Sequence, residues 1–364
     1  MTAPNETVVI TGSSGFIGQR LVEKMAPRFQ VVGLDIAEPQ QLPPHASFAP
    51  LDLTTDEGVR DALRQVRQRH GNRLASVIHL AAYFDLTGEP DPKYEAVTVR
   101  GTERLLRGLQ AFTVEQLVFS STMLVHAAGR PGERIDEERP LDPKLPYRAS
   151  KIETERLIEE QRGAIPVVLL RAAGVYDDLC HSPFIAHQIA RIYERSPKSH
   201  VYPGDPRAGQ SFIHLDDLSD AMLRLVERRA ALPPTTALVL GERDAMSYDE
   251  LQREIGRLVH GKEWQTWQVP KTLAKTGAWV QEEVLREDTF IKPWMVDTAD
   301  DHYALDTSRA WELLGWQPRH SLRETLPRMV AALKADPAGW YEANQLDPDR
   351  VPAVPTPEAA PGRR

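Results

Sequence analysis

One stretch near the N-terminus decides the fold: Thr7-Val8-Val9-Ile10-Thr11-Gly12-Ser13-Ser14-Gly15-Phe16-Ile17-Gly18. Its apolar first half predicts a strand, and the spaced glycines predict a tight turn into a helix. Gly12 allows the sharp turn, Gly15 lets backbone N–H groups approach a diphosphate, and Gly18 lets the helix lie close to the sheet. Because a helix N-terminus favours an anion, the stretch predicts a dinucleotide cofactor, against the alternative of a plain strand, turn and helix.

The second predicted strand, residues 30–35, ends in Asp35. A carboxylate at this point accepts hydrogen bonds from the ribose hydroxyls of NAD and repels the 2′-phosphate of NADP. Ile36 and Ala37 follow, so neither neighbour supplies a compensating cation. The sequence therefore predicts NAD, although an aspartate that caps a turn would give the same pattern.

Strands and helices alternate through the first half of the chain. Further apolar strands are predicted at 47–53, 75–80, 116–121 and 165–171, and a helix capped by Thr55 at 56–69. Apolar strands separated by helices indicate a parallel sheet covered on both faces, which binds ligands at the carboxyl ends of its strands. Asp52, Ala81 and Thr122 are expected there, whereas His79, inside a strand, is predicted to be a packed, hydrogen-bonded histidine.

A candidate proton relay follows in Pro146-Tyr147-Arg148-Ala149-Ser150-Lys151. Tyr147 and Lys151 are four residues apart at a predicted helix start, so they share one face. A tyrosine titrates near pH 10, and a neighbouring ammonium together with a positive nicotinamide ring would favour the phenolate. We expect Tyr147 to exchange a proton with a substrate hydroxyl or carbonyl held by Thr122. The alternative is a chance pair on a solvated helix.

Several motifs together resemble the extended short-chain dehydrogenase/reductases, the NAD-dependent epimerase/dehydratase family. They include Thr11-Gly12-x-x-Gly15-Phe16-Ile17-Gly18, Asp52-Leu53, His79-Leu80-Ala81-Ala82, Ser120-Ser121-Thr122, Tyr147-x-x-x-Lys151, Leu170-Arg171, Gly174-Val175-Tyr176, Phe212-Ile213-His214-Leu215-Asp216-Asp217 and Leu313-Leu314-Gly315-Trp316-Gln317-Pro318. The resemblance covers about residues 7–330. It implies a Rossmann-type, doubly wound parallel sheet of the α/β class with a smaller mixed α/β C-terminal substrate lobe.

The resemblance also implies roles for individual residues. Thr122, Tyr147 and Lys151 are the expected catalytic residues, and Lys151 is also expected to hold the nicotinamide ribose. The expected NAD-binding residues are Gly12, Ser14, Gly15, Phe16, Ile17, Asp35, Asp52, Leu53, Leu80, Ala81, Ala82, Ser120, Tyr147, Lys151 and Ala173. The expected substrate-binding residues are Tyr83, Phe84, Met123, Tyr176, Gln210 and Trp294.

Three departures from the family pattern bear on the reaction. Thr98 occupies the place of a frequent Asn, so a water relay through that Asn is not expected. Met123-Leu124 replaces the Asp-Glu pair of the sugar-nucleotide dehydratases, which argues against dehydration. Two arginines that bind the diphosphate in sugar-nucleotide epimerases fall on Gln210 and Val296. This argues against a nucleotide sugar, although Arg207 and Lys292 lie close enough in sequence to substitute.

In the second half, metal and thiol chemistry are weighed against structural roles. His214 with Asp216 and Asp217 is predicted to cap a helix rather than bind a metal, and no metal site is predicted. Cys180 and His181 are expected to line the site without catalysing. Helices are predicted at 184–194, 248–257, 308–314 and 322–333, and a strand end followed by a helix at 212–228. Four tryptophans are expected to form a small aromatic core, with Trp294 the best pocket candidate: Trp264, Trp267, Trp279 and Trp294.

The composition limits the partners. The 364 residues carry a net charge of −8, which disfavours nucleic acid or an anionic membrane, and no run approaches a membrane span. The single cysteine, Cys180, and the lack of an N-terminal leader pattern predict a cytoplasmic protein. The resemblance implies a homodimer through helices near 92–110 and 147–162.

The predicted domains are an NAD-binding domain at 1–175, to which 211–241 returns, and a substrate lobe formed by 176–210 and 242–335. Residues 336–364 are expected to be a tail with a disordered end. The function predicted is hydride transfer between NAD and a secondary alcohol or ketone. The alternatives are a nucleotide-sugar or other sugar epimerase with tightly bound NAD, and a non-catalytic NAD-binding scaffold.

Overall fold

Residues 7–18 form the strand, turn and helix that the sequence predicts. The computed structural model describes residues 6–85, 87–274 and 292–352, and in it β1 (Thr7–Thr11) leads through the glycine turn into α1 (Phe16–Met25). All five residues of β1 are buried, because the strand lies inside the sheet between β2 and β5.

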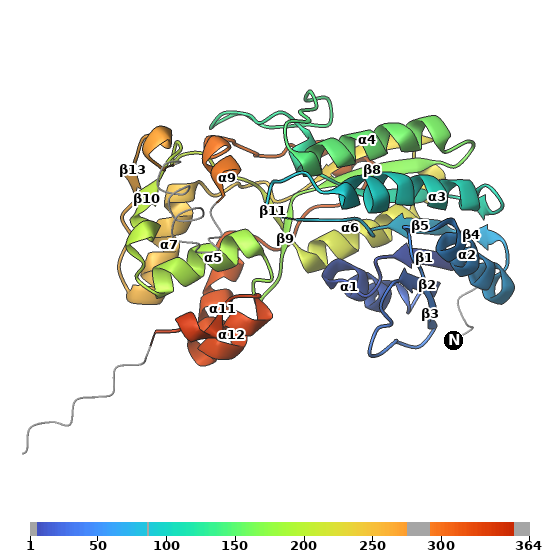
Figure 1. Ribbon diagram of the computed structural model, residues 1–364, viewed down its shortest axis with the longest axis horizontal. Helices are drawn as coiled ribbons and strands as arrows, with labels where there is room; N and C mark the ends of the chain where they lie inside the picture. Colours follow the sequence, from blue (N-terminus) through green and yellow to red (C-terminus); the bar gives the residue numbers. More distant parts are fainter. Residues whose placement is uncertain (1–5, 86, 275–291, 353–364) are drawn as a thin grey trace, which may run out of the picture.

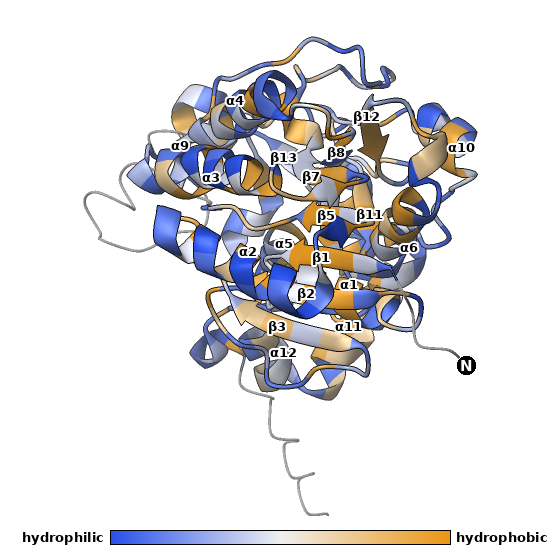
Figure 2. Cartoon of the chain, turned by 90° about the vertical axis from the view of Figure 1, so that its right-hand side faces the viewer, coloured by the Kyte–Doolittle hydropathy of each residue, from blue (hydrophilic) through white to orange (hydrophobic). Residues whose placement is uncertain are grey.

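The main sheet is parallel and has seven strands in the order β12-β8-β7-β5-β1-β2-β3. Its other strands are β2 (Gln30–Asp35), β3 (Ala46–Pro50), β5 (Ser76–His79), β7 (Leu117–Thr122), β8 (Val167–Ala172) and β12 (Thr235–Leu240). Figure 2 shows these strands as a largely apolar layer between two layers of helices. The prediction of an α/β doubly wound sheet is confirmed.

Each face of the sheet has its own apolar core. On one face α1, α6 (Leu215–Glu227) and α10 (Ser308–Leu314) pack over the strands. On the other lie α2 (Asp56–His70), α3 (Arg100–Leu109) and α4 (Pro146–Gln161). As predicted, Thr55 caps α2 by accepting a hydrogen bond of 3.0 Å from the Gly58 N–H, a contact of the kind that stabilises a helix by about 1 kcal/mol.

The second lobe is built on a third apolar cluster and lies at the carboxyl end of the sheet (Figure 1). Its main helices are α5 (Pro183–Tyr193), α7 (Tyr248–His260), α9 (Pro293–Asp297), α11 (Leu322–Ala335) and α12 (Pro337–Ala343). Two short parallel pairs accompany them, β9 (Gly174–Tyr176) with β11 (Phe212–His214) and β10 (Val201–Tyr202) with β13 (Trp267–Gln268). A further pair, β4 (Arg73–Leu74) with β6 (Thr113–Val114), lies beside the main sheet.

The structure divides the second half of the chain differently from the expectation. Tyr303, Leu305 and Leu314 belong to the core under α6 and β12, because the edge strand β12 needs an apolar cover that α10 supplies. Residues 337–346 are part of the second lobe, where Trp340 and Tyr341 of α12 are buried. The expected tail therefore contains a packed helix, and residues 353–364 lie outside the described part of the chain.

The tryptophans do not form a single core. Trp264 is buried and stacks on His200 with ring centroids 4.4 Å apart, while Trp267 also stacks on His200, at 5.1 Å, and is 61% exposed. Trp294 lies elsewhere, in the pocket described below. Trp279 lies outside the described residues.

Candidate active site

The glycine turn at the end of β1 leaves room for a ligand. Gly12 has a φ of +71°, and a Cβ there would lie 2.8 Å from the Ala81 nitrogen. A Cβ on Gly18 would collide with the Gly12 carbonyl oxygen, whereas one on Gly15 would meet nothing closer than 3.5 Å. Gly12 and Gly18 thus serve close backbone packing, and Gly15 leaves open space at the start of α1.

The start of α1 and the end of β2 suit a dinucleotide. No side chain caps α1, so its first N–H groups remain donors for a diphosphate. The Asp35 carboxylate is fixed by hydrogen bonds from the Ser14 N–H (2.9 Å) and the Ile36 N–H (2.7 Å). These residues fit NAD: Gly15 and α1 would hold the diphosphate, and Asp35 the adenosine ribose.

The other predicted cofactor residues follow the carboxyl ends of neighbouring strands. Asp52 accepts hydrogen bonds from the backbone and hydroxyl of Thr54, which lower the pKa of its carboxyl group. The remaining predicted cofactor residues lie within or after strands β3, β5, β7 and β8: Leu53, Leu80, Ala81, Ala82, Ser120 and Ala173. Their contact with NAD stays a prediction.

His79 is the packed histidine that the sequence predicts. Its ring nitrogens lie 2.7 Å from Thr11 Oγ1 and 2.9 Å from Thr102 Oγ1, and the side chain is 1% exposed. Burial and the nearby Lys151 ammonium lower the pKa of His79 to about 3, so the ring is neutral. A neutral histidine bonded to two threonines is a structural link between β5, β1 and α3.

Thr122, Tyr147 and Lys151 meet where β7 ends and α4 begins. Thr122 Oγ1 accepts a hydrogen bond from the Leu124 N–H (3.2 Å), and its hydroxyl hydrogen-bonds the Tyr147 phenol, which favours the phenolate. Lys151 Nζ donates a hydrogen bond of 2.7 Å to the Ser120 carbonyl oxygen and lies 5.9 Å from the centroid of the Tyr147 ring. The ring of Phe84 packs edge-on against Tyr147 at 5.1 Å.

In the protein without NAD the pKa of Tyr147 is raised, and its expected lowering by the lysine together with a bound nicotinamide stays a prediction. Burial raises the pKa of Tyr147 to about 12, and the Thr122 hydrogen bond only partly opposes this. Burial also lowers the pKa of Lys151 to about 8, so the ammonium is present at neutral pH but weakened. The physical reason is that desolvation outweighs a charge whose hydrogen bond is directed to Ser120 rather than to the phenol.

A buried ion pair lies on the face of α4 that carries Tyr147 and Lys151, and the sequence interpretation missed it. Glu155 accepts a hydrogen bond from Ser121 and pairs with Arg171 through Oε2 at 2.7 Å, with both side chains at least nine-tenths buried. Glu155 is four residues after Lys151, and its charge raises the pKa of that lysine against the effect of burial. The spacing 147, 151, 155 is the signal that identifies this face of the helix.

Thr98 sits in a π-helical turn (η1, Tyr94–Val99) that leads into α3. Its hydroxyl accepts a hydrogen bond of 3.0 Å from the Tyr83 N–H. Thr98 therefore fixes the loop after β5, which carries Phe84 to the Tyr147 ring.

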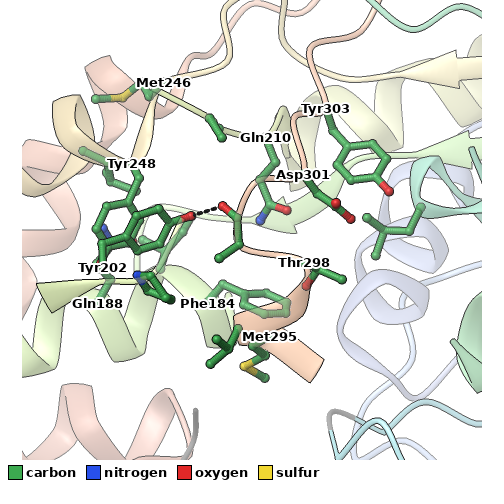
Figure 3. Close-up of a pocket in the computed structure, with 18 of the residues that line it drawn as sticks. Phe184, Gln188, Tyr202, Gln210, Met246, Tyr248, Met295, Thr298, Asp301 and Tyr303 are labelled. Carbon is green, nitrogen blue, oxygen red and sulfur yellow. Dashed lines mark hydrogen bonds between the residues drawn. The ribbon is translucent and has the colours of Figure 1, made fainter. Parts of the chain in front are cut away.

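A pocket of about 260 Å³ opens in the second lobe. It is bounded on the catalytic side by Leu124 and Arg148, which closely follow Thr122 and Tyr147 in sequence. Figure 3 shows Asp301 and Tyr303 on one side of the pocket and the stacked rings of Tyr202 and Tyr248 on the other. Most of the other lining side chains are apolar, among them Phe184, Ile185, Val201, Phe212, Met246, Leu251, Met295 and Val296.

The predicted substrate residues fall into two groups. Gln210 and Trp294 line the pocket. Tyr83, Phe84, Met123 and Tyr176 are not among its described lining residues. Tyr176 is fully buried, and its hydroxyl donates a hydrogen bond of 2.7 Å to Glu242. Substrate contact by any of them stays a prediction.

At the two family positions for a diphosphate-binding arginine the pocket carries no cation, although Arg148 and Arg191 line it at other positions. Gln210 and Val296, which occupy those positions, both line the pocket. Arg207 does not supply the missing charge, because its side chain is 80% exposed and donates hydrogen bonds to the Asp205 carboxylate. Arg207 is also absent from the described pocket lining.

His214 caps α6, as predicted, by accepting a hydrogen bond of 3.2 Å from the Asp216 N–H. The structure adds His320, whose ring stacks on His214 at 4.1 Å, so potential ligand atoms of these two and Asp216 lie within 4.8 Å of one another. Stacked imidazole rings cannot both direct a nitrogen lone pair at one ion, and Asp216 is paired with Arg20. The arrangement gives no support for a metal centre.

Cys180 and His181 have separate surroundings. Cys180 is fully buried, and burial raises the pKa of its thiol to about 12. His181 bonds Asp177 at 2.7 Å, which raises its pKa, and packs against Phe16 at the start of α1. Neither lines the described pocket, so the thiol is inert packing and only His181 borders the cofactor turn.

The parallel sheet, glycine turn and strand-end acid define a dinucleotide-binding protein of the α/β class. The chain belongs to the NAD dependent epimerase/dehydratase family, whose model matches residues 8–241. The family is NAD-dependent, in agreement with the fit of Gly15, α1 and Asp35 to this cofactor. No helix in the described segments is long and apolar enough to cross a membrane.

Relatives of two kinds are similar to the chain. Short-chain dehydrogenase/reductase family 42E member 1 of Mus musculus is 30% identical over 60% of this chain, which spans 57% of that protein. UDP-glucose 4-epimerase of Streptomyces lividans is 29% identical, over 69% of this chain and 80% of the length of the epimerase. The chain is also 23% identical to 3 beta-hydroxysteroid dehydrogenase type 7 of Mus musculus, over 91% of this chain and 96% of that one.

Solved structures share the fold. UDP-glucose 4-epimerase of Thermus thermophilus, in complex with NAD, aligns with a TM-score of 0.68 at 23% identity, over 91% of this chain and 99% of that one. MoeE5 in complex with UDP-glucose and NAD aligns with a TM-score of 0.66, also at 23% identity, over 90% and 99%. At these identities the likeness supports the fold and not the substrate.

Proposed function

We propose that the protein is an NAD-dependent dehydrogenase or reductase that interconverts a secondary alcohol and a ketone on a mainly apolar molecule. One observation supports the proposal. Leu124 and Arg148, which closely follow Thr122 and Tyr147 in sequence, line a largely apolar pocket. The steroid dehydrogenase among the relatives supports the same reaction class. NAD, when bound, supplies the hydride acceptor or donor.

The proton chemistry belongs to Tyr147. Its Oη takes the proton of the substrate hydroxyl during oxidation and returns it during reduction. Thr122 holds the reacting oxygen, and Lys151 supplies a positive charge and holds the nicotinamide ribose. Because burial alone holds the tyrosine pKa near 12, the positive cofactor ring must supply the remaining stabilisation of the phenolate.

A nucleotide-sugar epimerase is the second candidate, favoured by the UDP-glucose 4-epimerase of Streptomyces lividans, which matches over 80% of its length. The uncharged Gln210 and Val296 in the pocket oppose it. A non-catalytic scaffold is disfavoured, because such a protein has no need of the Thr122–Tyr147 hydrogen bond. A cytoplasmic homodimer that pairs through α3 and α4 is part of the proposal and is supported by the adjacency of these helices.

The deciding experiment offers free NAD and a panel of alicyclic and steroid alcohols to the purified protein and follows NADH absorbance. A dehydrogenase produces NADH in proportion to the alcohol consumed. Conversion of UDP-glucose to UDP-galactose without net NADH would instead establish the epimerase. Turnover of neither substrate class, with NAD bound, would favour the scaffold.

A further inference from the structure

We propose that Arg148 and Asp301 form a recognition point for a carboxylate on the substrate, so that the enzyme acts on hydroxy or keto acids with an apolar body. The inference rests on the proposed function and narrows its substrate class. It starts from a charged pair on the wall of an otherwise mainly uncharged pocket.

The Arg148 side chain is held deep in the protein by few partners. It is only 4% exposed, and its Nη2 lies 3.2 Å from Asp301 Oδ2 in a single, long contact. Its guanidinium lies 5.7 Å from the centroid of the Tyr303 ring. The Arg148 Nε–H is buried without a hydrogen-bond partner, a state that costs free energy unless a ligand satisfies it.

A second orphan donor lies in the same pocket. Gln188 is 7% exposed, and its Nε2 also lacks a partner. Both residues line the pocket from different helices, α4 and α5. Two hydrogen-bond donors without partners, Arg148 Nε and Gln188 Nε2, indicate a ligand that carries acceptor oxygens.

The charge balance of the pocket favours an anion. Its described lining residues include two cations, Arg148 and Arg191, and one carboxylate, Asp301. Burial raises the pKa of Asp301 even with Arg148 beside it, so this aspartate is a weakened counterion. Lys144 and Lys271 act on the same carboxylate from outside the pocket lining. A monoanionic carboxylate would complete the pairing, and the planar guanidinium matches its geometry.

Arg148 is adjacent in sequence to the proposed proton-exchanging residue, so the proposal also relates the carboxylate to the reacting carbon. Arg148 directly follows Tyr147 on α4, and one helical step turns the side chain by about 100°. Tyr147 accordingly meets Thr122 and Phe84, while Arg148 meets Asp301 and Tyr303. One small molecule can therefore offer its carbinol to Tyr147 and its carboxylate to Arg148.

The first test measures binding without turnover. Cyclohexanecarboxylate and the neutral cyclohexanecarboxamide are titrated by calorimetry into wild type, Arg148→Met, Arg148→Lys, Asp301→Asn and the control Arg207→Met. We expect wild type and Arg207→Met to prefer the carboxylate, and Arg148→Met to bind it about 10- to 100-fold more weakly. Arg148→Lys should recover part of the loss, and Asp301→Asn should bind it more tightly, because a competing anion is gone.

The second test measures selectivity in turnover. Alicyclic hydroxy acids are compared with their methyl esters as substrates, and Arg148→Met should raise KM for the acid by a larger factor than KM for the ester. Equal losses for acid and ester, or carboxylate binding that Arg148→Met and Asp301→Asn do not alter, would overturn the inference. If neutral alcohols reduce NAD while no carboxylate binds, the inference fails and the proposed function stands. If carboxylate binds through Arg148 but no alcohol or ketone reacts, the proposed function fails instead.

Discussion

Lys151 donates a hydrogen bond of 2.7 Å to the carbonyl oxygen of Ser120, and this bond directs its ammonium group to the end of β7 rather than to the Tyr147 phenol. The lysine Nζ lies 5.9 Å from the centroid of the tyrosine ring. The protein alone therefore does not stabilise the phenolate, because burial holds the Tyr147 pKa near 12 and the Lys151 pKa near 8. The proposed chemistry requires a further positive charge, which the oxidised nicotinamide ring would supply.

Replacement of Tyr147 by Phe removes the proton-exchanging hydroxyl and keeps the ring. We expect kcat to fall by about 10²- to 10⁴-fold, with NAD affinity within a few-fold of wild type. NADH absorbance gives the rate, and tryptophan fluorescence gives cofactor binding. Tyr193→Phe, in α5 and outside the site, is the matched control. Full activity in Tyr147→Phe would remove the phenol from the mechanism.

Lys151→Met should make the protein more stable at neutral pH while it abolishes activity. Burial lowers the Lys151 pKa from 10.5 to about 8, so the folded state pays a free-energy cost for the buried ammonium, which the variant removes. Loss of the hydrogen bond to Ser120 offsets part of this effect, and the free energy of unfolding should rise by about 2 kcal/mol. The lysine is charged in both states below pH 8, so the gain is complete there. It disappears as the pH rises through 10.5, where the unfolded lysine also becomes neutral.

Urea unfolding at pH 7 and pH 10 measures this difference. The wild type should become more stable relative to Lys151→Met between the two pH values, because its unfolded state binds the extra proton in that interval. A variant that is less stable than wild type at pH 7 would show that the buried ammonium is well compensated.

Asp35 should set the choice between NAD and NADP. Its carboxylate is held by the Ser14 and Ile36 N–H groups, so it cannot turn away from a 2′-phosphate without losing both bonds. We expect Asp35→Ala to weaken NAD binding about 10- to 100-fold, and Asp35→Ala with Ile36→Arg to bind NADP more tightly than NAD. Fluorescence titration measures both affinities, with exposed Asp61→Ala as the control. Equal affinity of the wild type for NAD and NADP would contradict this role.

The parts of the site that local sequence encodes could be predicted. The turn around Gly12, the acid at the end of β2 and the four-residue step from Tyr147 to Lys151 each depend on neighbours within one strand, turn or helix. Their secondary structure and relative order follow from apolar patterning and from the rule that parallel strands present their carboxyl ends on one edge.

Contacts between distant segments could not be predicted. Arg148 meets Asp301 across 153 residues, and His214 stacks on His320, which the sequence interpretation did not consider as a companion. The effect of burial, which raises the pKa of Tyr147 in the protein without NAD, could not be predicted from two residues four apart. The tryptophans were grouped by their proximity in sequence, whereas packing separates Trp294 from Trp264.

Gly88 packs closely against Trp294, one of the residues that line the pocket of the second lobe. It lies in the loop between β5 and η1 with a φ of +78°, and a Cβ there would collide with the indole of Trp294. Gly88→Ala should therefore displace Trp294, raise KM for the alcohol several-fold and shift the tryptophan emission, while NAD affinity stays unchanged. Gly132→Ala is the matched control, since Gly132 has a φ of +94° and no atom within 4 Å of the added carbon. Both variants carry backbone strain of about 1 kcal/mol, so a loss common to both would reflect strain alone, and only a loss specific to Gly88→Ala places Trp294 at the substrate.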